Sequence, residues 1–158
     1  MRNDREGRGG VVDSGLFSLV EDLLKTQRSA ALATQERGQP YLSLMAFAVA
    51  PDLKTIILAT DRYTRKYTNL MVEPRVALLV DNRSNTPADT REAVAVTVLG
   101  EAREATPEER PEVLALFLAK HPQLESFATS PNCALITVEV ASYIMVQSFE
   151  EVRELKMV

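Results

Sequence analysis

The hydrophobic positions near the start of the chain repeat with the period of a helix. Leucine and valine recur three and four residues apart at Leu16, Leu19, Val20, Leu23 and Leu24. This spacing places them on one face of an amphipathic helix. We expect that helix over about residues 15–27, with Asp13 or Ser14 as its cap, because a short oxygen side chain accepts hydrogen bonds from the free amides of the first turn.

Stretches rich in β-branched and other apolar residues follow, and they predict strands. These stretches are Ser29–Thr34, Tyr41–Val49, Thr55–Thr60, Arg75–Asp81, Ala93–Glu104 and Cys133–Phe149. Gly38 is able to adopt a positive φ in a hairpin turn between the first two, and Gly100 is the expected site of a bulge. Ala141-Ser142 is a candidate break in the last strand. For the tail, Glu150–Val158, the pattern leaves a last strand and a short helix both open.

Two further segments carry the start signals of helices. A short helix is expected to begin near Thr64 and to end before Pro74. A second helix begins at Thr106-Pro107-Glu108-Glu109, where Thr is the expected N-cap, Pro takes the first helical position and Glu the third. It runs to His121-Pro122. Residues 82–92 are rich in Asn, Ser, Pro, Asp and Thr, and we interpret them as a long loop.

The connections between most strands are short, which favours an antiparallel sheet over parallel βαβ units. About six strands in a domain of this size favour a small closed barrel, because closure removes the exposed sheet edges. The predicted fold class is therefore mainly β (α+β), a six-stranded antiparallel β-barrel with flanking helices over residues 14–158. Residues 1–13 are charged and Gly-rich, so we expect a disordered N-terminal arm there and no signal peptide.

Composition narrows the classes of function. The chain has 158 residues, 46% hydrophobic and 25% charged, as in one globular domain with a buried core. With 18 basic and 22 acidic residues the net charge is −4, which argues against a general nucleic-acid binder. One Cys and one His exclude a disulfide framework and disfavour a zinc site. No uncharged apolar run approaches the roughly 18 residues of a membrane span, so we expect a cytoplasmic protein with no nucleic-acid or membrane partner and no metal site.

Residue types that often perform catalysis are sparse. His121 lies at the expected end of a helix, where we interpret it as a helix-end cation or a solvated residue, with a ligand role as the alternative. Cys133 opens an apolar strand and is expected to be a small buried hydrophobe rather than a nucleophile. The adjacent pairs Glu108-Glu109 and Glu150-Glu151 do not face each other on a helix, so we expect them to be solvated. The sequence has neither a P-loop nor a G-x-G-x-x-G motif, and no catalytic residue is assigned.

The segment Thr60–Asn69 carries the most distinctive chemistry. It leaves a buried strand and opens a helix, with a hydroxyl at Thr64 and two cations, Arg65 and Lys66, in the first turn. Cations are unfavourable there, because a helix N-terminus already has partial positive charge. A bound phosphate would reverse that penalty by accepting from the free amides, the hydroxyl and both cations. The alternative is a solvated basic helix face.

These residues belong to a longer series of motifs. Thr64-Arg65-Lys66 is followed by Asn69-Leu70 and Glu73–Leu78, the opening hairpin contains Ala31–Thr34 and Gly38–Ser43, and a later strand ends in Gly100-Glu101-Ala102. This order resembles the pyridoxamine 5′-phosphate oxidase-like, FMN-binding split-barrel superfamily. The resemblance covers roughly residues 16–105 well and the last strand loosely. It implies a six-stranded split barrel and a homodimer, with FMN in a groove between the two protomers.

The resemblance also implies cofactor contacts at particular positions. Those that match phosphate and ribityl contacts are Thr60, Thr64, Arg65 and Lys66. The strand whose backbone lines the isoalloxazine ring is matched by Ser43, Leu44 and Met45. Asn82, where the fourth strand ends, is a weaker candidate for a flavin contact. Gln147 is the polar member of Tyr143–Phe149, a segment that matches a contact with the partner's flavin.

The chain departs from true pyridoxamine phosphate oxidases at its C-terminal end. Those enzymes carry substrate-binding elements with Arg and His there, whereas Val152–Val158 has no His, so pyridoxamine phosphate is not the expected substrate. The first hypothesis is a dimeric FMN-binding flavoprotein, an oxidoreductase of unknown substrate. The alternatives are a haem-binding or haem-utilisation split-barrel protein, with His121 as the only imidazole available for haem iron, and a non-catalytic flavin-binding module. A deazaflavin in place of FMN also stays open.

Overall fold

The computed structural model describes residues 13–148 and 150–157; most of the arm expected at residues 1–13 lies outside that range. The strands are β1 (Ser29–Glu36), β2 (Gln39–Val49), β3 (Thr55–Asp61), β4 (Arg75–Asp81), β5 (Val94–Glu104), β6 (Cys133–Gln147) and β7 (Glu151–Lys156). The helices are α1 (Ser14–Thr26), α2 (Arg65–Val72), α3 (Asp89–Glu92), α4 (Arg110–Lys120), the 3-10 turn η1 (Pro122–Leu124) and α5 (Glu125–Ala128). Most predicted elements are therefore present with nearly the expected bounds.

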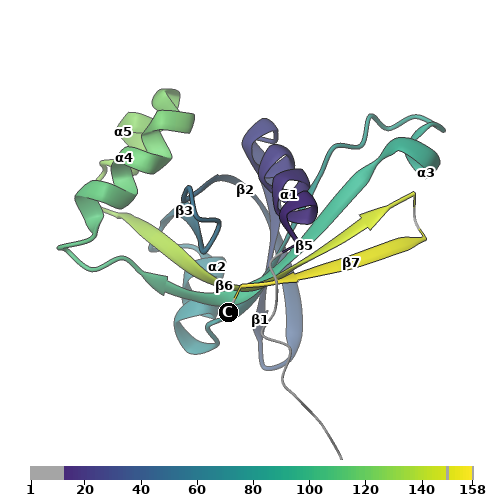
Figure 1. Cartoon of the computed structure of the whole chain (residues 1–158). Helices are drawn as coiled ribbons and strands as arrows, with labels where there is room; N and C mark the ends of the chain where they lie inside the picture. Colours follow the sequence, from purple (N-terminus) through teal and green to yellow (C-terminus); the bar gives the residue numbers. More distant parts are fainter. Residues whose placement is uncertain (1–12, 149, 158) are drawn as a thin grey trace, which may run out of the picture.

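The strands form one antiparallel sheet that closes on itself (Figure 1). Its order is β3-β2-β1-β4-β5-β6-β7, and a further pairing between β3 and β6 closes six strands into a barrel. This confirms the predicted six-stranded antiparallel barrel with flanking helices. Among the described residues, no helix has the length and apolarity that a bilayer crossing requires.

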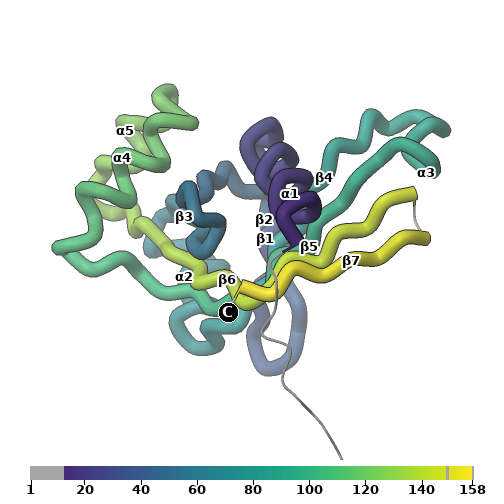
Figure 2. Tube along the Cα trace, viewed as in Figure 1, coloured from purple at the N-terminus to yellow at the C-terminus, as the bar shows by residue number. Residues whose placement is uncertain are grey.

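β6 is long enough to take part in two structures. Residues 133–139 pair with β3 inside the barrel, whereas residues 142–147 pair with β7 outside it. Figure 2 shows the resulting β6–β7 hairpin projecting from the barrel beside α3, on the side opposite α4 and α5. For the tail, the sequence pattern is compatible with either a strand or a helix, and the structure shows a strand, β7.

Two glycines take the positions that the pattern assigned to them. Gly38 has φ 82 and Arg37 has φ 50, so the β1–β2 hairpin turns through two residues with positive φ, which is the geometry favoured for two-residue hairpins. At Gly100 the β5–β6 register shifts, because Leu99 pairs with Ser142 while Gly100 pairs with Val140. Ala141 is thus the extra residue of a bulge, and the expected break in β6 is this bulge within a continuous strand.

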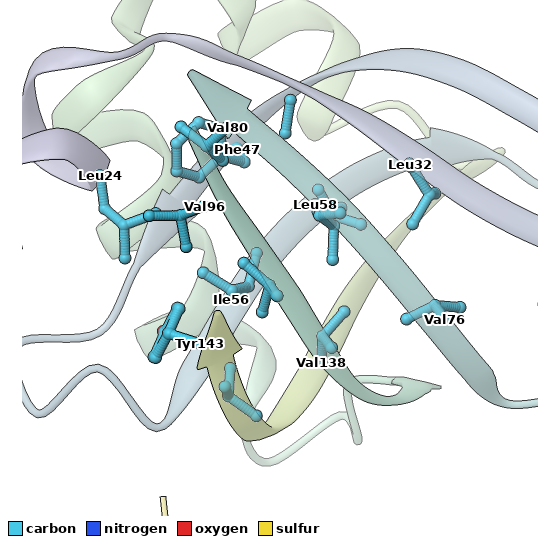
Figure 3. Close-up of a cluster of buried hydrophobic side chains, with 14 of the residues drawn as sticks. Leu24, Leu32, Phe47, Ile56, Leu58, Val76, Val80, Val96, Val138 and Tyr143 are labelled. Carbon is cyan, nitrogen blue, oxygen red and sulfur yellow. The ribbon is translucent and has the colours of Figure 1, made fainter. Parts of the chain in front are cut away.

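The barrel interior is filled by side chains from every strand of the ring. Figure 3 shows the inward-pointing residues of the core, among them Leu32, Phe47, Leu58 and Val96. Helix α1 is capped by the Asp13 carboxylate, and its buried stripe (Leu16, Val20, Leu23 and Leu24) packs against this core. A second apolar cluster lies beneath α4 and contains Phe117 and Cys133, so Cys133 is the buried hydrophobe that the sequence predicted. Burial raises the pKa of its thiol.

Four local predictions need correction. The loop at residues 82–92 contains one helical turn, α3, because the Asp89 carboxylate accepts hydrogen bonds from the amides of Ser84, Asn85 and Thr86 and folds the loop back on itself. Helix α4 begins at Arg110 rather than just after Thr106. The predicted capping bonds between Thr106 and Glu109 do form, but they close a turn that precedes the helix. Glu109 also pairs with Arg103 instead of being solvated only.

His121 is the fourth correction, because it is neither solvated nor a surface cation. It is 1% exposed, its Nε2 lies 2.8 Å from the Phe47 carbonyl oxygen, and its ring packs 5.1 Å from that of Phe117. Helix α4 ends at Lys120 and His121 caps it, so the turn into Pro122 directs the ring into the interface between α4 and β2. The imidazole therefore joins a helix to the barrel.

Candidate cofactor site

Five of the nine residues predicted to contact a cofactor line one cavity of about 370 Å³. It lies where β2 and β3 meet the start of α2 and the α4–α5 segment. Its lining comprises Leu44, Met45, Ala46, Ala59, Thr60, Asp61, Thr64, Lys66, Phe117, Leu124 and Phe127. Of the predicted residues, Leu44, Met45, Thr60, Thr64 and Lys66 are among them. A larger cavity of about 610 Å³ lies at the β5–β6 bulge and contains none of the predicted residues.

The turn from β3 into α2 is held by its own side chains. The Thr64 hydroxyl donates to the Asp61 carbonyl oxygen at 2.8 Å and caps α2 by accepting from the Tyr67 amide at 3.4 Å. The buried Thr60 hydroxyl lies 3.1 Å from that of Thr64, and the Asp61 carboxylate accepts from the Tyr63 amide at 2.7 Å. The start of α2 is therefore built before any ligand arrives.

This turn leaves backbone donors free at the start of α2. Among the hydrogen bonds of the described residues, none uses the amides of Arg65 or Lys66, which open α2. Lys66 lines the cavity, and among the described residues its ammonium has no carboxylate or hydrogen-bond partner. Free amides and a cation at a helix N-terminus form a favourable environment for a phosphate.

Arg65 has a different environment from Lys66. Its guanidinium lies 3.5 Å from the Glu36 carboxylate and 4.7 Å from the centre of the Tyr41 ring. Both partners belong to the β1–β2 hairpin, and Arg65 does not line the cavity. The two adjacent cations that the sequence grouped together therefore face different neighbours.

The barrel opens beside this turn because β2 and β3 diverge. They pair only from Phe47 to Val49 on β2, opposite Ile56 to Leu58 on β3. The stretch of β2 from Leu44 to Ala46 consequently has no strand on its β3 side, and this stretch lines the cavity. Leu44 points outward and is 80% exposed, while Met45 is buried in the barrel and Ser43 does not line the cavity.

The remaining wall is apolar and comes from a distant part of the chain. Phe117 of α4, Leu124 of η1 and Phe127 of α5 face the cavity, and Phe127 is partly exposed. Sequence reasoning did not identify these three residues, because nothing in a short helix indicates which strand it will cover. The cavity thus combines a polar, cationic end with an apolar wall and an unpaired strand edge.

Asn82 and Gln147 lie together at another place. Asn82 exchanges hydrogen bonds with Val94, whose amide donates to the Asn82 side-chain oxygen at 2.7 Å, and Gln147 pairs with Val94 in the β5–β6 ladder. Neither lines the cavity of its own chain. Tyr143 is wholly buried and donates to the Leu53 carbonyl oxygen at 2.6 Å, so within Tyr143–Phe149 this residue is part of the core, and Phe149 lies outside the described residues.

Comparison with known families agrees with this geometry. A family model described as pyridoxamine 5′-phosphate oxidase matches residues 18–147, a range that includes every residue that lines the cavity. Among curated protein sequences, none matches the chain.

Several solved structures share the fold. General Stress Protein 26 from Bacillus anthracis aligns with a TM-score of 0.67 and 19% identity, over 90% of this chain and 98% of that one. A heme binding protein from Mycobacterium smegmatis aligns with a TM-score of 0.76 and 16% identity, over 85% of this chain and 55% of that one. A FAD-binding protein from Mesorhizobium loti aligns with a TM-score of 0.62 and 15% identity, over 87% and 92%. This chain therefore spans about half of the Mycobacterium smegmatis protein, and likeness at these identities is a likeness of fold.

Proposed function

The chain belongs to the pyridoxamine 5′-phosphate oxidase family, and from that premise we propose that it is an FMN-binding flavoprotein with oxidoreductase activity. The observation that carries the proposal is the cavity at the start of α2. There, Lys66, whose amide and ammonium have no partner among the described residues, lies beside a length of β2 that has no strand on its β3 side. Its donors match the phosphate of a flavin mononucleotide.

The rest of the cavity also fits a flavin. An isoalloxazine ring has one edge of carbonyl and N–H groups and two flat apolar faces. The main chain from Leu44 to Ala46 pairs with β1 but has no strand on its β3 side, and there it offers hydrogen-bonding groups to such an edge. Phe117, Leu124 and Phe127 offer apolar contact. FMN supplies hydride or electron transfer when bound. The residues of this chain would bind the phosphate, orient the ring and exclude water from it.

We also propose that the protein is a homodimer with the cofactor at the protomer interface. Leu44 lines the cavity and is nevertheless largely exposed, so a second protomer against this face would cover it. Asn82 and Gln147 lie away from the cavity of their own chain, and we assign them to the flavin of the partner subunit. The free buried thiol of Cys133 agrees with a cytoplasmic location.

Haem is the main alternative cofactor, because one structural neighbour is a heme binding protein. Another neighbour is a FAD-binding protein, so relatives of this fold include both kinds. His121 is the only imidazole of the chain, and its Nε2 is engaged by the Phe47 carbonyl group in the core. It is therefore a poor axial ligand, which favours a flavin. A deazaflavin and a non-catalytic flavin-binding module use the same cavity and are separated by experiment.

The first test is the absorbance spectrum of the purified protein before and after FMN addition and gel filtration. We expect flavin bands near about 375 and 450 nm that co-elute with the protein. In the double variant Arg65→Ala/Lys66→Ala the bands should elute separately, because the phosphate has lost its cations. Protein that stays colourless with FMN contradicts the proposal, and a Soret band after haem addition would then favour haem. A yellow protein with no turnover by common reductants would indicate the non-catalytic module.

A further inference from the structure

A partly buried carboxylate at the end of β5 faces the segment that carries Lys66. Glu104 accepts hydrogen bonds from two donors, the Arg62 guanidinium on one oxygen and the Tyr67 hydroxyl, at 3.0 Å, on the other. Burial and then the Glu104 carboxylate raise the pKa of Tyr67, so its hydroxyl stays protonated and continues to donate. Glu104 does not line the cavity itself.

The two donors lie on either side of the cavity residues in the sequence. Arg62 precedes Thr64 by two residues, and Tyr67 directly follows Lys66. The loop before β6 also holds Arg62. The Arg62 amide donates to the Asn132 carbonyl oxygen at 3.0 Å, and the Arg62 guanidinium donates to the Pro131 carbonyl oxygen at 2.9 Å. One carboxylate thus ties both ends of residues 62–67 to the barrel.

We propose that Glu104 is a positioning residue for anion binding at the start of α2. By holding Arg62 and Tyr67, it keeps the Lys66 side chain and the two free amides in place before the ligand binds. A site that is ordered in advance loses less conformational entropy on binding, so it binds more tightly. The inference rests on the proposed function, because it assumes that the phosphate of FMN is the anion.

Simple electrostatics predicts the opposite effect for this residue. A carboxylate near an anion site repels the anion, so its neutralisation should strengthen binding if charge alone mattered. A positioning role predicts weaker anion binding in Glu104→Gln, because a glutamine offers a single acceptor oxygen and turns an N–H group toward one of the two donors. The sign of the change therefore distinguishes the two roles.

The test compares Glu104→Gln with Glu109→Gln in the full chain. Glu109 follows the same strand and is held by the Arg103 guanidinium at 2.7 and 2.8 Å, but it forms no hydrogen bond or ion pair with residues 62–67. Both variants remove one charge and one ion pair. The readouts are the dissociation constants for FMN and for riboflavin, which lacks the phosphate, measured by flavin fluorescence together with the melting temperature.

We expect Glu104→Gln to weaken FMN binding by about tenfold or more, as misplacement of a binding group does, and to reduce the preference for FMN over riboflavin. Glu109→Gln should leave both quantities within about twofold, since surface ion pairs contribute little. Unchanged or tighter FMN binding by Glu104→Gln overturns the positioning role while the proposed function stands. An equal loss for FMN and riboflavin also overturns it, because the effect is then not on the phosphate. A wild-type chain that binds no FMN overturns the proposed function and the positioning role with it.

Discussion

Lys66 and Arg65 are adjacent in the chain but have different partners. Lys66 lines the cavity without an internal partner among the described residues, whereas Arg65 is engaged by Glu36 and the Tyr41 ring. The sequence could predict that this dipeptide opens a helix beside a strand. It could not predict which cation faces the cavity, because that depends on where the β1–β2 hairpin lies in space.

The single variants should therefore differ. In the proposed FMN site, Lys66→Ala would remove a charge-assisted contact with the phosphate, which contributes about 1.5–3 kcal/mol, so FMN affinity should fall by roughly ten- to a hundredfold. Arg65→Ala should have a smaller effect, since Arg65 reaches the ligand only by leaving Glu36. Fluorescence titration with FMN measures both. A larger loss in Arg65→Ala than in Lys66→Ala would contradict the assignment of Lys66 as the phosphate ligand.

His121 is expected to stabilise the fold rather than bind haem. His121→Ala leaves the Phe47 carbonyl group without its buried donor, which should lower the free energy of unfolding by about 1–3 kcal/mol. Urea denaturation measures this loss. If added haem gives a Soret band, that band should persist in the variant. A band that disappears while the variant remains folded would identify His121 as a haem ligand and favour the haem hypothesis.

At the scale of elements, the β5–β6 bulge depends on the absence of a side chain at Gly100. A Cβ atom there would clash with the Glu139 carbonyl oxygen and lie 2.8 Å from a methyl group of Val138. Gly100→Ala should therefore lower the free energy of unfolding by about 1–3 kcal/mol. Gly15→Ala is the matched control, because a Cβ at that helical position meets its nearest atom at 3.4 Å. Thermal or urea unfolding that ranks the two variants equally would contradict this view of the bulge.

Helices α1 and α4 are joined by a lysine whose charge is disfavoured. The Lys120 ammonium donates to the Leu24 carbonyl oxygen at 2.8 Å and lies 3.8 Å from the centre of the Phe47 ring. Burial, and then Arg28, lower the pKa of Lys120 from 10.5 to about 8. Between these pH values the unfolded chain binds more protons at this position than the folded chain does. Lys120 therefore makes the free energy of unfolding rise with pH through that window.

Lys120→Met should remove this rise. The free energy of unfolding of the wild type, relative to that of the variant, is expected to increase from about pH 8 to about pH 10.5, as measured by urea denaturation at each pH. Groups present in both chains, such as Cys133 and Tyr67, cancel in the difference. Lys25→Met is the control, since Lys25 is exposed on α1 and pairs with Glu21. A constant difference for Lys120→Met would show that its proton is not linked to folding.

Elements with strong periodicity or clear turn chemistry were predictable, and those that depend on tertiary partners were not. β4 follows directly from its apolar residues between Pro74 and Asn82. β7 has no such pattern and exists because β6 continues beyond the barrel and offers it an edge. The cavity shows the same division. The hydroxyl of Thr64 and the cation of Lys66 were predictable from the sequence as groups at the start of a helix. Phe127 was not, because it belongs to a short helix that reaches the cavity only in the folded chain.

At the scale of the whole molecule, the outer face of the barrel carries two apolar rows. Strand register aligns Leu42, Ala33, Ala77 and Leu99 across β2, β1, β4 and β5, and it aligns Leu44, Ala31 and Leu79 in the adjacent row. The exposed fractions of Leu42, Leu44, Leu79 and Leu99 are 67%, 80%, 38% and 39%. Leu44 also lines the cavity, so the apolar face and the candidate cofactor site are continuous. A second protomer on this face would bury the leucines and cover the cavity together.

Dimerisation and FMN binding should therefore fail together when this face is made polar. Leu42→Asp and Leu99→Asp lie outside the cavity lining, but each puts a carboxylate where about 1.5–3 kcal/mol of apolar burial is expected. Sedimentation velocity should show monomers at concentrations where the wild type is dimeric, and FMN should elute free of the variants. Leu19→Asp on α1, where the wild-type side chain is 40% exposed, is matched to Leu99 in exposure and should stay dimeric. A monomeric variant that keeps wild-type FMN affinity would show that one protomer holds the cofactor alone, because the loss of the partner would then leave the site complete.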